Sequence, residues 1–334
     1  MSSKENRGIS HTILEILREK SRNGLIYTRK IMLAEKIQSN VIRKALQYYV
    51  NNWGISTHPA PFILAYEAVG GNPNDAMEAQ AAIVMLSAAL DIHDDIIDKS
   101  VRKRGKLTVV GKFGSDIALL LGNAFFIKGF SLFSTYIGKL DEEKRNKAIQ
   151  ILKEAMFEVG DAHALEFNFR GKTNADPEEY MKILQMKAVT TQVTMQLGAI
   201  FGGGTVKETE ALARYGRILG TLAALREEFI DIFDVQELNQ RIQKECLPIP
   251  ILYAVQDMDS KEIRRIISQR TVKKNDLPKL LEIIFGSHEV KELREKMESM
   301  ARVSANTVQE IKNEEIKSLL TQLAASMLED IADP

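Results

Sequence analysis

The stretch Asp91-Ile-His-Asp-Asp-Ile-Ile-Asp98 follows an almost wholly apolar segment, Ala81 to Leu90, and governs how the rest of the chain is interpreted. In a helix, residues three, four and seven apart share one face, so the four aspartates would lie along one stripe. Such crowding of like charges is unfavourable unless a cation binds, and Mg²⁺ takes carboxylate oxygens while sharing its coordination with substrate phosphates. A solvated acidic helix end is the alternative. Because the preceding segment is apolar, we favour a metal site built from Asp94, Asp95 and Asp98.

The overall composition excludes several classes of function. Lys+Arg and Asp+Glu both total 45 among 334 residues, so no net charge directs the protein to nucleic acid or to an acidic membrane surface. The single cysteine, Cys246, excludes an intramolecular disulfide and fits a reducing compartment. We find neither an apolar signal region nor an uninterrupted apolar run of membrane-span length. We therefore expect a cytoplasmic protein without nucleic-acid partners or a transmembrane segment.

Helical periodicity dominates the chain, and convincing alternating strand patterns are absent. We expect helices over 31–50, 76–98, 116–136, 142–159, 177–201 and 205–234, with Gly202-Gly203-Gly204 as a stop and Asn174-Ala-Asp-Pro as a start. No linker-like stretch divides residues 1–334. The prediction is an all-α chain that forms one large helical bundle, with the more charged residues 261–334 as peripheral helices packed on the core.

A second acidic segment, Arg226-Glu-Glu-Phe-Ile-Asp231, lies far downstream, also after a small, uncharged stretch. Two acidic clusters at the ends of buried helices can face each other across a bundle, where bundle proteins build metal sites. Together they could hold Mg²⁺ ions around a diphosphate leaving group, with Arg104, Lys187 and Lys244 adding positive charge. Taken alone, the second segment could equally consist of ordinary surface acids.

These motifs resemble the trans-polyprenyl diphosphate synthase family, which has the class I isoprenoid (terpenoid) synthase fold. The segment Leu90 to Gly105 is similar to the first aspartate-rich motif of the family with its trailing Arg-Arg-Gly. The similarity extends over about residues 30–260, the expected catalytic core. Further similar segments are Glu67-Ala-Val-Gly-Gly71, Leu121-Gly-Asn123, Tyr180 with Lys187, Leu197-Gly-Ala199 and Lys244-Glu-Cys-Leu-Pro248.

The resemblance implies a bundle around a deep central cavity, a homodimer, and an allylic prenyl diphosphate held by three Mg²⁺ ions. In the family, bulky residues just before the first motif form the floor of the cavity, and here a small Ala89 implies a deep one. Phe125 could line an aromatic wall suited to an allylic cation, although core packing is its simpler explanation. The implied metal ligands are Asp94, Asp95, Asp98, Glu227, Glu228 and Asp231, and the implied diphosphate contacts are Arg104, Lys187 and Lys244.

The departures from the family pattern affect the acceptor side. Family elongases hold isopentenyl diphosphate with Gly-Gly-Lys-Arg-x-Arg-Pro, whereas here the stretch is Trp53-Gly-Ile-Ser-Thr-His-Pro59. The basic positions are Ile55, Ser56 and His58, so several charge-assisted hydrogen bonds worth ~1.5–3 kcal/mol each would be lost. In the second motif, glutamates stand where the family has aspartates. We therefore expect poor use of isopentenyl diphosphate.

Three hypotheses about function follow. Our main expectation is Mg²⁺-dependent ionisation of a long-chain allylic prenyl diphosphate, followed by cyclisation, as in a terpene synthase, or by transfer to an acceptor other than isopentenyl diphosphate. The alternative is a chain-elongating polyprenyl diphosphate synthase of the geranylgeranyl or geranylfarnesyl type. The third is a non-catalytic regulatory subunit in a heteromer with another prenyl synthase, although such a subunit would not need the intact set of first-motif aspartates.

Overall fold

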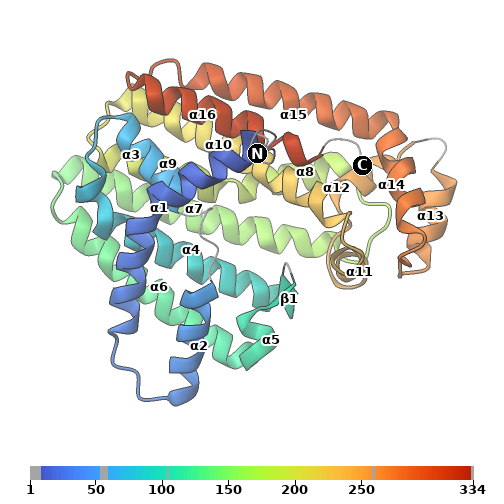
Figure 1. Cartoon of the computed structure of the whole chain (residues 1–334), viewed down its shortest axis with the longest axis horizontal. Helices are drawn as coiled ribbons and strands as arrows, with labels where there is room; N and C mark the ends of the chain where they lie inside the picture. The colour runs from blue at the N-terminus through green and yellow to red at the C-terminus, as the bar shows by residue number, and fades with distance from the viewer. Residues whose placement is uncertain (1–8, 53–58, 104, 258–259, 332–334) are drawn as a thin grey trace, which may run out of the picture.

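The computed structural model describes residues 9–52, 59–103, 105–257 and 260–331, and these form an almost entirely helical bundle (Figure 1). The all-α prediction is confirmed. The α-helices are α1 Ile9–Leu33, α2 Asn40–Asn52, α3 Pro59–Ala68, α4 Met77–Ile97, α5 Val109–Phe113, α6 Ser115–Ile137, α7 Glu142–Glu166, α8 Pro177–Lys187, α9 Val189–Phe201, α10 Val206–Asp231, α11 Val235–Lys244, α12 Ile249–Ala254, α13 Lys261–Ser268, α14 Leu277–Gly286, α15 His288–Thr307 and α16 Glu314–Ser326. Three 3₁₀ turns and a small antiparallel hairpin complete the described chain: η1 Pro73–Ala76, η2 Phe167–Phe169, η3 Glu329–Ile331, β1 Arg102–Lys103 and β2 Lys106–Leu107.

Two helix boundaries differ from the sequence prediction. The segment 31–50 is not one helix, because the chain leaves α1 after Leu33 and α2 starts only at Asn40. The segment 177–201 is divided at Ala188 into α8 and α9, although its apolar spacing is continuous. In both places the apolar pattern persists through a change of direction, which periodicity alone does not detect.

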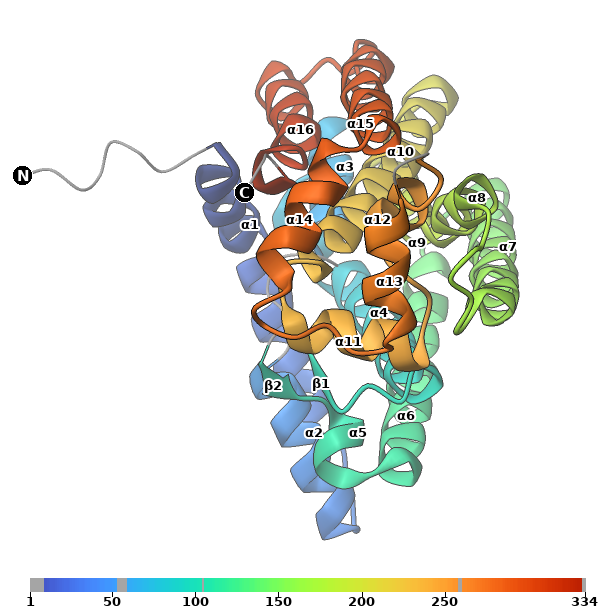
Figure 2. The ribbon, with the colours of Figure 1, turned by 90° about the vertical axis from the view of Figure 1, so that its right-hand side faces the viewer.

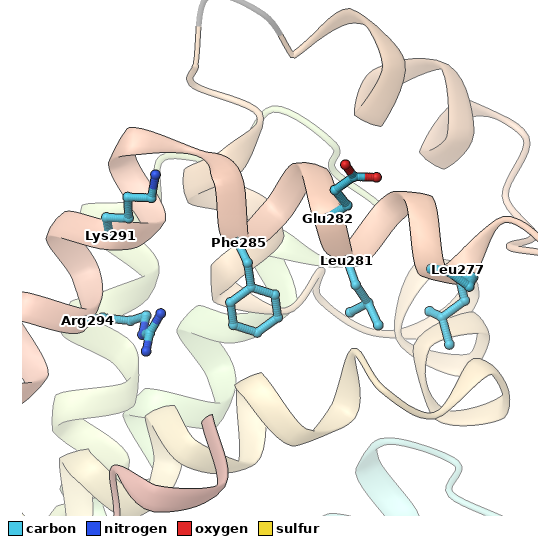
Figure 3. A pocket seen from close by; sticks show the side chains of 7 residues that line it. Leu277, Leu281, Glu282, Phe285, Lys291 and Arg294 are labelled. Atoms are coloured by element: carbon cyan, nitrogen blue, oxygen red, sulfur yellow. The ribbon is translucent and has the colours of Figure 1, made fainter. Parts of the chain in front are cut away.

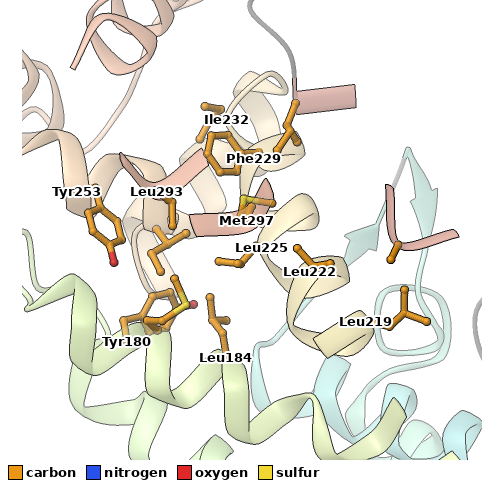
Figure 4. Packing of buried hydrophobic residues seen from close by; sticks show 14 of the residues in the cluster. Tyr180, Leu184, Leu219, Leu222, Leu225, Phe229, Ile232, Tyr253, Leu293 and Met297 are labelled. Carbon is orange, nitrogen blue, oxygen red and sulfur yellow. The ribbon is translucent and has the colours of Figure 1, made fainter. Parts of the chain in front are cut away.

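The core consists of three buried clusters. The largest packs α8, α10, α12, α15 and α16 against one another around residues such as Tyr180, Leu225, Phe229 and Met297 (Figure 4). A second cluster joins α3, α4, α6, α7 and α9, and a third joins α2, α4, α5 and α6 (Figure 2). Since the C-terminal helices contribute fully buried side chains to the largest cluster, they are an integral part of the bundle and more than a peripheral cover.

Helices α4 and α6 approach each other closely because glycines face the contact. A Cβ on Gly122 would lie 2.6 Å from Nε2 of His93, and one on Gly129 would lie 3.0 Å from the Leu86 backbone nitrogen. A side chain at Gly122 would require His93 to move, and one at Gly129 would require α4 to shift slightly, so glycine at both positions permits the close approach. This close packing fixes the C-terminal end of α4, which carries the first acidic motif.

By length and composition alone, one helix among the described residues, α6, could cross a membrane, although the sequence analysis found no such run. A buried core helix meets the same criteria, and the inner side of α6 packs against α4 in this structure. Its outer side is unusual, since Leu119, Leu120, Ile127 and Phe130 are exposed. An exposed apolar helix side of this kind is typical of an interface.

Candidate active site

The first acidic motif occupies the C-terminal end of α4, and its aspartates are held by cations from other elements. The Lys103 ammonium, on the hairpin that follows α4, lies 2.8 Å from Oδ1 of Asp95 and 3.1 Å from Oδ2 of Asp94. Arg170, just after η2, donates to Asp98 at 2.7 Å. Lys103 therefore bridges Asp94 and Asp95, while Asp98 pairs with a separate cation, Arg170.

The second acidic motif ends α10 and faces a single buried arginine on α11. Arg241 donates to Oε1 of Glu228 and to Oδ2 of Asp231, each at 2.6 Å. Glu227 lies on a different side of α10, where its side chain is 45% exposed and its Oε1 is 3.7 Å from Nη1 of Arg226. The second motif is thus divided between one solvent-facing glutamate and two carboxylates that share a guanidinium.

A chain of polar contacts connects the two motifs through α7 and α8. Nδ1 of His163 is 3.6 Å from Asp94, and the Lys187 ammonium is 2.5 Å from Oε2 of Glu166. The Tyr180 hydroxyl donates to the other oxygen of Glu166 at 3.2 Å and lies 3.4 Å from Oε1 of Glu228. The two motifs therefore belong to one electrostatic unit, as expected if both serve the same site.

Burial and neighbouring charges give the clustered carboxyl groups different pKa values. Burial opposes ionisation of Asp94, but Lys103, Lys187 and His163 outweigh it and hold the pKa of Asp94 below its ordinary value. Burial raises the pKa of Asp95 to about 6 despite Lys103. Burial, together with the charge of Asp94, raises the pKa of Asp98 to about 7. Clusters with such divergent pKa values are typical of functional sites.

The first motif fits a hard divalent cation by the chemistry of its donors. Asp94 and Asp95 contact Lys103 of the basic hairpin and Asp98 contacts Arg170, and Mg²⁺ uses one or two carboxylates with substrate phosphates and retains several waters. Within the described residues, no group of three or more His, Cys, Asp or Glu side chains is arranged so that it could hold a metal ion. A Mg²⁺ site here would therefore depend on phosphate oxygens to complete its coordination.

The structure places the remaining predicted residues as follows. Lys187 is at the C-terminal end of α8. Burial lowers its pKa, but the charges of Glu166 and Asp94 outweigh burial, so the pKa is above its ordinary value and the lysine stays charged. Lys244 is exposed at the end of α11, beyond Arg241. Arg104 and the predicted acceptor segment 53–58 lie outside the described residues. Their assigned roles stay predictions.

Both residues predicted to contact the prenyl chain are in the third core cluster. Ala89 and Phe125 are completely buried there, beside Met85 and Ile92. The ring of Phe125 also contacts Tyr49 edge to face. Phe125 is therefore a core residue in this structure. A role for Phe125 or Ala89 in lining a substrate cavity stays a prediction.

Sequence reasoning missed the residues that hold the motifs in place. Glu166, Arg170 and Arg241 were not candidates, yet each pairs with a predicted site residue. Nothing in the local pattern singles them out, since Arg170 is 72 residues from its partner Asp98. The clue for Arg241 was weak: it is one of two basic residues in the last turn of α11, three residues before Lys244.

The surface also carries a hollow of about 620 Å³ between α14 and α15 (Figure 3). The side chains of Leu277, Leu281 and Phe285 extend from one side of α14, while Glu282 points away on the other. Leu281 and Phe285 are only 7% and 6% exposed, so the hollow offers little apolar surface. It lacks clustered carboxylates and is not the candidate site.

Comparisons with known proteins identify the fold and the family of this chain. A solved structure, geranylgeranyl pyrophosphate synthetase from Pyrococcus horikoshii Ot3, matches with a TM-score of 0.82 and 21% identity and covers 96% of this chain and 98% of its own, which shows the fold. The short chain isoprenyl diphosphate synthase of Methanothermobacter thermautotrophicus is 27% identical over 77% of this chain and 79% of its own. The octaprenyl diphosphate synthase of Escherichia coli is also 27% identical, over 67% of this chain and 69% of its own. The polyprenyl synthetase family model matches residues 39–284, and the chain accordingly belongs to the polyprenyl synthetase family.

Proposed function

We propose that this protein is a chain-elongating prenyl diphosphate synthase, which ionises an allylic prenyl diphosphate and joins it to isopentenyl diphosphate. The observation that carries this proposal is the similarity to relatives named as isoprenyl and octaprenyl diphosphate synthases, combined with the intact first motif. This was our alternative hypothesis from the sequence. The similarity supports it better than cyclisation or transfer to another acceptor, which was our main expectation.

In this proposal the first motif receives Mg²⁺ and the diphosphate of the allylic substrate. Bound Mg²⁺ would neutralise the diphosphate and make it a better leaving group. Lys187 adds a fixed positive charge beside Asp94, because Glu166 holds its ammonium in place. Lys103 can exchange its contacts with Asp94 and Asp95 for contacts with phosphate oxygens, since its side chain is 45% exposed on the hairpin.

A second candidate function rests on the acceptor segment. Ile55, Ser56 and His58 replace the cations with which family elongases bind isopentenyl diphosphate, and one histidine of ordinary pKa near ~6.5 supplies at most one partial charge. Under this candidate the ionised chain cyclises or reacts with another acceptor. A non-catalytic role in a heteromer is the third possibility.

One experiment separates these functions. The protein is incubated with Mg²⁺ and allylic diphosphates of increasing length, with and without isopentenyl diphosphate, and the products are identified by mass spectrometry. Elongation predicts longer diphosphates only when isopentenyl diphosphate is present. Diphosphate release with a cyclic product in its absence would favour the second candidate. No turnover with any substrate would favour the regulatory role. Asp94→Ala, checked for folding by circular dichroism, is the inactive control.

We also propose that the protein is a homodimer that associates through α6. The exposed side of this helix carries Leu119, Leu120, Ile127 and Phe130 and almost no charge. On the neighbouring α7, Phe157 is 72% exposed. Several large apolar side chains exposed on one side of a helix are typical of a subunit interface.

A further inference from the structure

The second acidic motif already contains a cation of its own. Arg241 uses three different nitrogens: Nη1 donates to Asp231, Nη2 to Glu228, and Nε to the carbonyl oxygen of Cys246 at 2.9 Å. A guanidinium that binds two carboxylates through its planar fork forms strong, directional hydrogen bonds. Glu228 and Asp231, which the family resemblance implies are metal ligands, therefore already have a positively charged partner in Arg241.

Both carboxylate oxygens of Glu228 already accept hydrogen bonds from within the protein. Its Oε1 accepts from Arg241 and lies near the Tyr180 hydroxyl, and its Oε2 accepts from the backbone N–H of Ile249 at 2.9 Å. The residue is only 6% exposed. Turning this side chain toward a metal would break each of these contacts and leave the buried donors of Arg241 and Ile249 unsatisfied, which is costly.

Arg241 itself is fixed in position. It is 7% exposed, and its Nη2 also donates to the Tyr180 hydroxyl at 3.2 Å, so contacts from α8, α10 and the segment after α11 surround it. Glu245, four residues on, adds a carboxylate 3.5 Å from Nε. Withdrawing this arginine would leave Glu228 and Asp231 as adjacent buried carboxylates without a counter-ion, which is unfavourable.

The first motif differs in this respect. Its main counter-ion, Lys103, lies on an exposed two-residue strand, and the lysine side chain is five times as exposed as that of Arg241, 45% against 9%. The Lys103 ammonium sits on a flexible stem that reaches solvent, so a divalent cation can replace it as the counter-ion of Asp94 and Asp95. The clustered carboxylates are thus neutralised by a displaceable cation, Lys103, at the first motif and by a fixed cation, Arg241, at the second.

We propose that Arg241 takes the place of a metal ion between Glu228 and Asp231, so that these two carboxylates bind this guanidinium and do not ligate a divalent cation. This inference rests on the proposed function. Arg241 then acts as a positioning residue: through Tyr180 it supports Glu166, which in turn holds Lys187 beside Asp94. The protein binds fewer Mg²⁺ ions than the three that the family resemblance implies.

The test counts bound Mn²⁺ by electron paramagnetic resonance on the full-length protein, with inorganic pyrophosphate as the anion. Loss of a metal ligand or of its support weakens metal binding by about 10–100-fold. We expect Asp231→Asn and Glu228→Gln to bind as many ions as wild type, with dissociation constants within about threefold. Asp94→Asn should lose at least one ion. A lost ion or a tenfold weaker dissociation constant in the Asp231 or Glu228 variant overturns the proposal.

The second part of the test asks whether removing Arg241 creates an additional Mn²⁺ site. Arg241→Met leaves two carboxylates facing each other, so this variant should bind one more Mn²⁺ than wild type, whereas Arg241→Lys should not. Arg265→Met is the control, because Arg265 also forms an arginine–glutamate pair, with Glu262 on α13, outside both motifs. Circular dichroism confirms that each variant is folded, and if Arg241→Met does not fold, the Asp231 and Glu228 variants still decide the question.

The outcomes distinguish this inference from the proposed function. If wild type makes no elongated product and binds no Mn²⁺ with pyrophosphate, the proposed function fails, and the gain of an ion in Arg241→Met still supports the assignment of Arg241. If wild type elongates but Arg241→Met gains no ion and Asp231→Asn loses one, the proposed function stands and the assignment of Arg241 is wrong.

Discussion

The Lys103 ammonium lies between Asp94 and Asp95, 3.1 Å from one carboxylate and 2.8 Å from the other. Burial lowers the pKa of Lys103, but the two aspartates outweigh burial and raise it, so the lysine stays charged. It therefore neutralises part of the first motif when no metal is present. Any Mg²⁺ that binds these aspartates must compete with this ammonium.

Lys103→Met should strengthen Mg²⁺ binding in the absence of diphosphate. Removing a competing, partly exposed ion pair changes the binding free energy by about 1 kcal/mol, roughly fivefold in affinity. Isothermal titration calorimetry measures this change. Lys106→Met, which removes an exposed lysine from the other strand of the same hairpin, is the control and should bind as wild type does. Unchanged or weaker binding in the Lys103 variant would contradict the competition.

Asp95→Asn should stabilise the metal-free protein at pH 8 and have little effect near pH 4. Because the pKa of Asp95 is raised from 3.8 to about 6, the folded state binds its proton more tightly than the unfolded state. The stability that this group contributes is present below pH 4 and is lost as the pH rises through 6. The gain at pH 8 is at most about 3 kcal/mol in the free energy of unfolding. Urea denaturation at both pH values measures the change in the free energy of unfolding. An equal change at pH 4 and pH 8 would refute the raised pKa of Asp95.

Asp94→Asn should destabilise the metal-free protein at pH 8, the opposite of the effect expected for Asp95→Asn. Its pKa is lowered, so its charged form stabilises the fold above the ordinary pKa of 3.8, and this contribution is lost as the pH falls. Repulsion between the crowded aspartates, taken alone, would favour higher stability when this acid is removed. The structure adds Lys103 and Lys187 as partners. We now expect a loss of about 1–3 kcal/mol at pH 8, measured by urea denaturation without metal. A gain in stability would mean that repulsion dominates.

The sequence was sufficient for the fold class and for the grouping of the first-motif acids, because helical periodicity is a local property. It was not sufficient for the partners of those acids. Arg170 and Arg241 come from separate elements, and their pairing depends on tertiary packing that one sequence does not encode in a readable pattern. For the same reason the sequence could not show that Glu228 and Asp231 share a buried arginine.

Ile127→Glu should convert the proposed homodimer into a monomer. Ile127 is 68% exposed on the apolar side of α6, and a buried, unpaired carboxylate at an interface is costly. Val206→Glu is the matched control, because Val206 is 74% exposed at the start of α10. Size-exclusion chromatography with light scattering should show a smaller mass only for the Ile127 variant. A monomeric wild type, or a dimeric Ile127 variant, would exclude this interface.

Ala89→Phe should shorten the preferred prenyl chain. Ala89 lies on α4 less than two turns before Asp94. It is fully buried in the cluster that contains Phe125, so a larger side chain here must displace its neighbours or a prenyl chain bound beside it. Overpacking a closed core costs about 1–3 kcal/mol of stability wherever it occurs. The control is therefore Ala82→Phe, which overpacks the same helix in a different cluster. Both variants should unfold at lower urea concentrations, but only Ala89→Phe should shift the product distribution toward shorter chains. If both variants, or neither, change the product length, Ala89 does not limit the chain, and the small residues before the first motif serve helix packing alone.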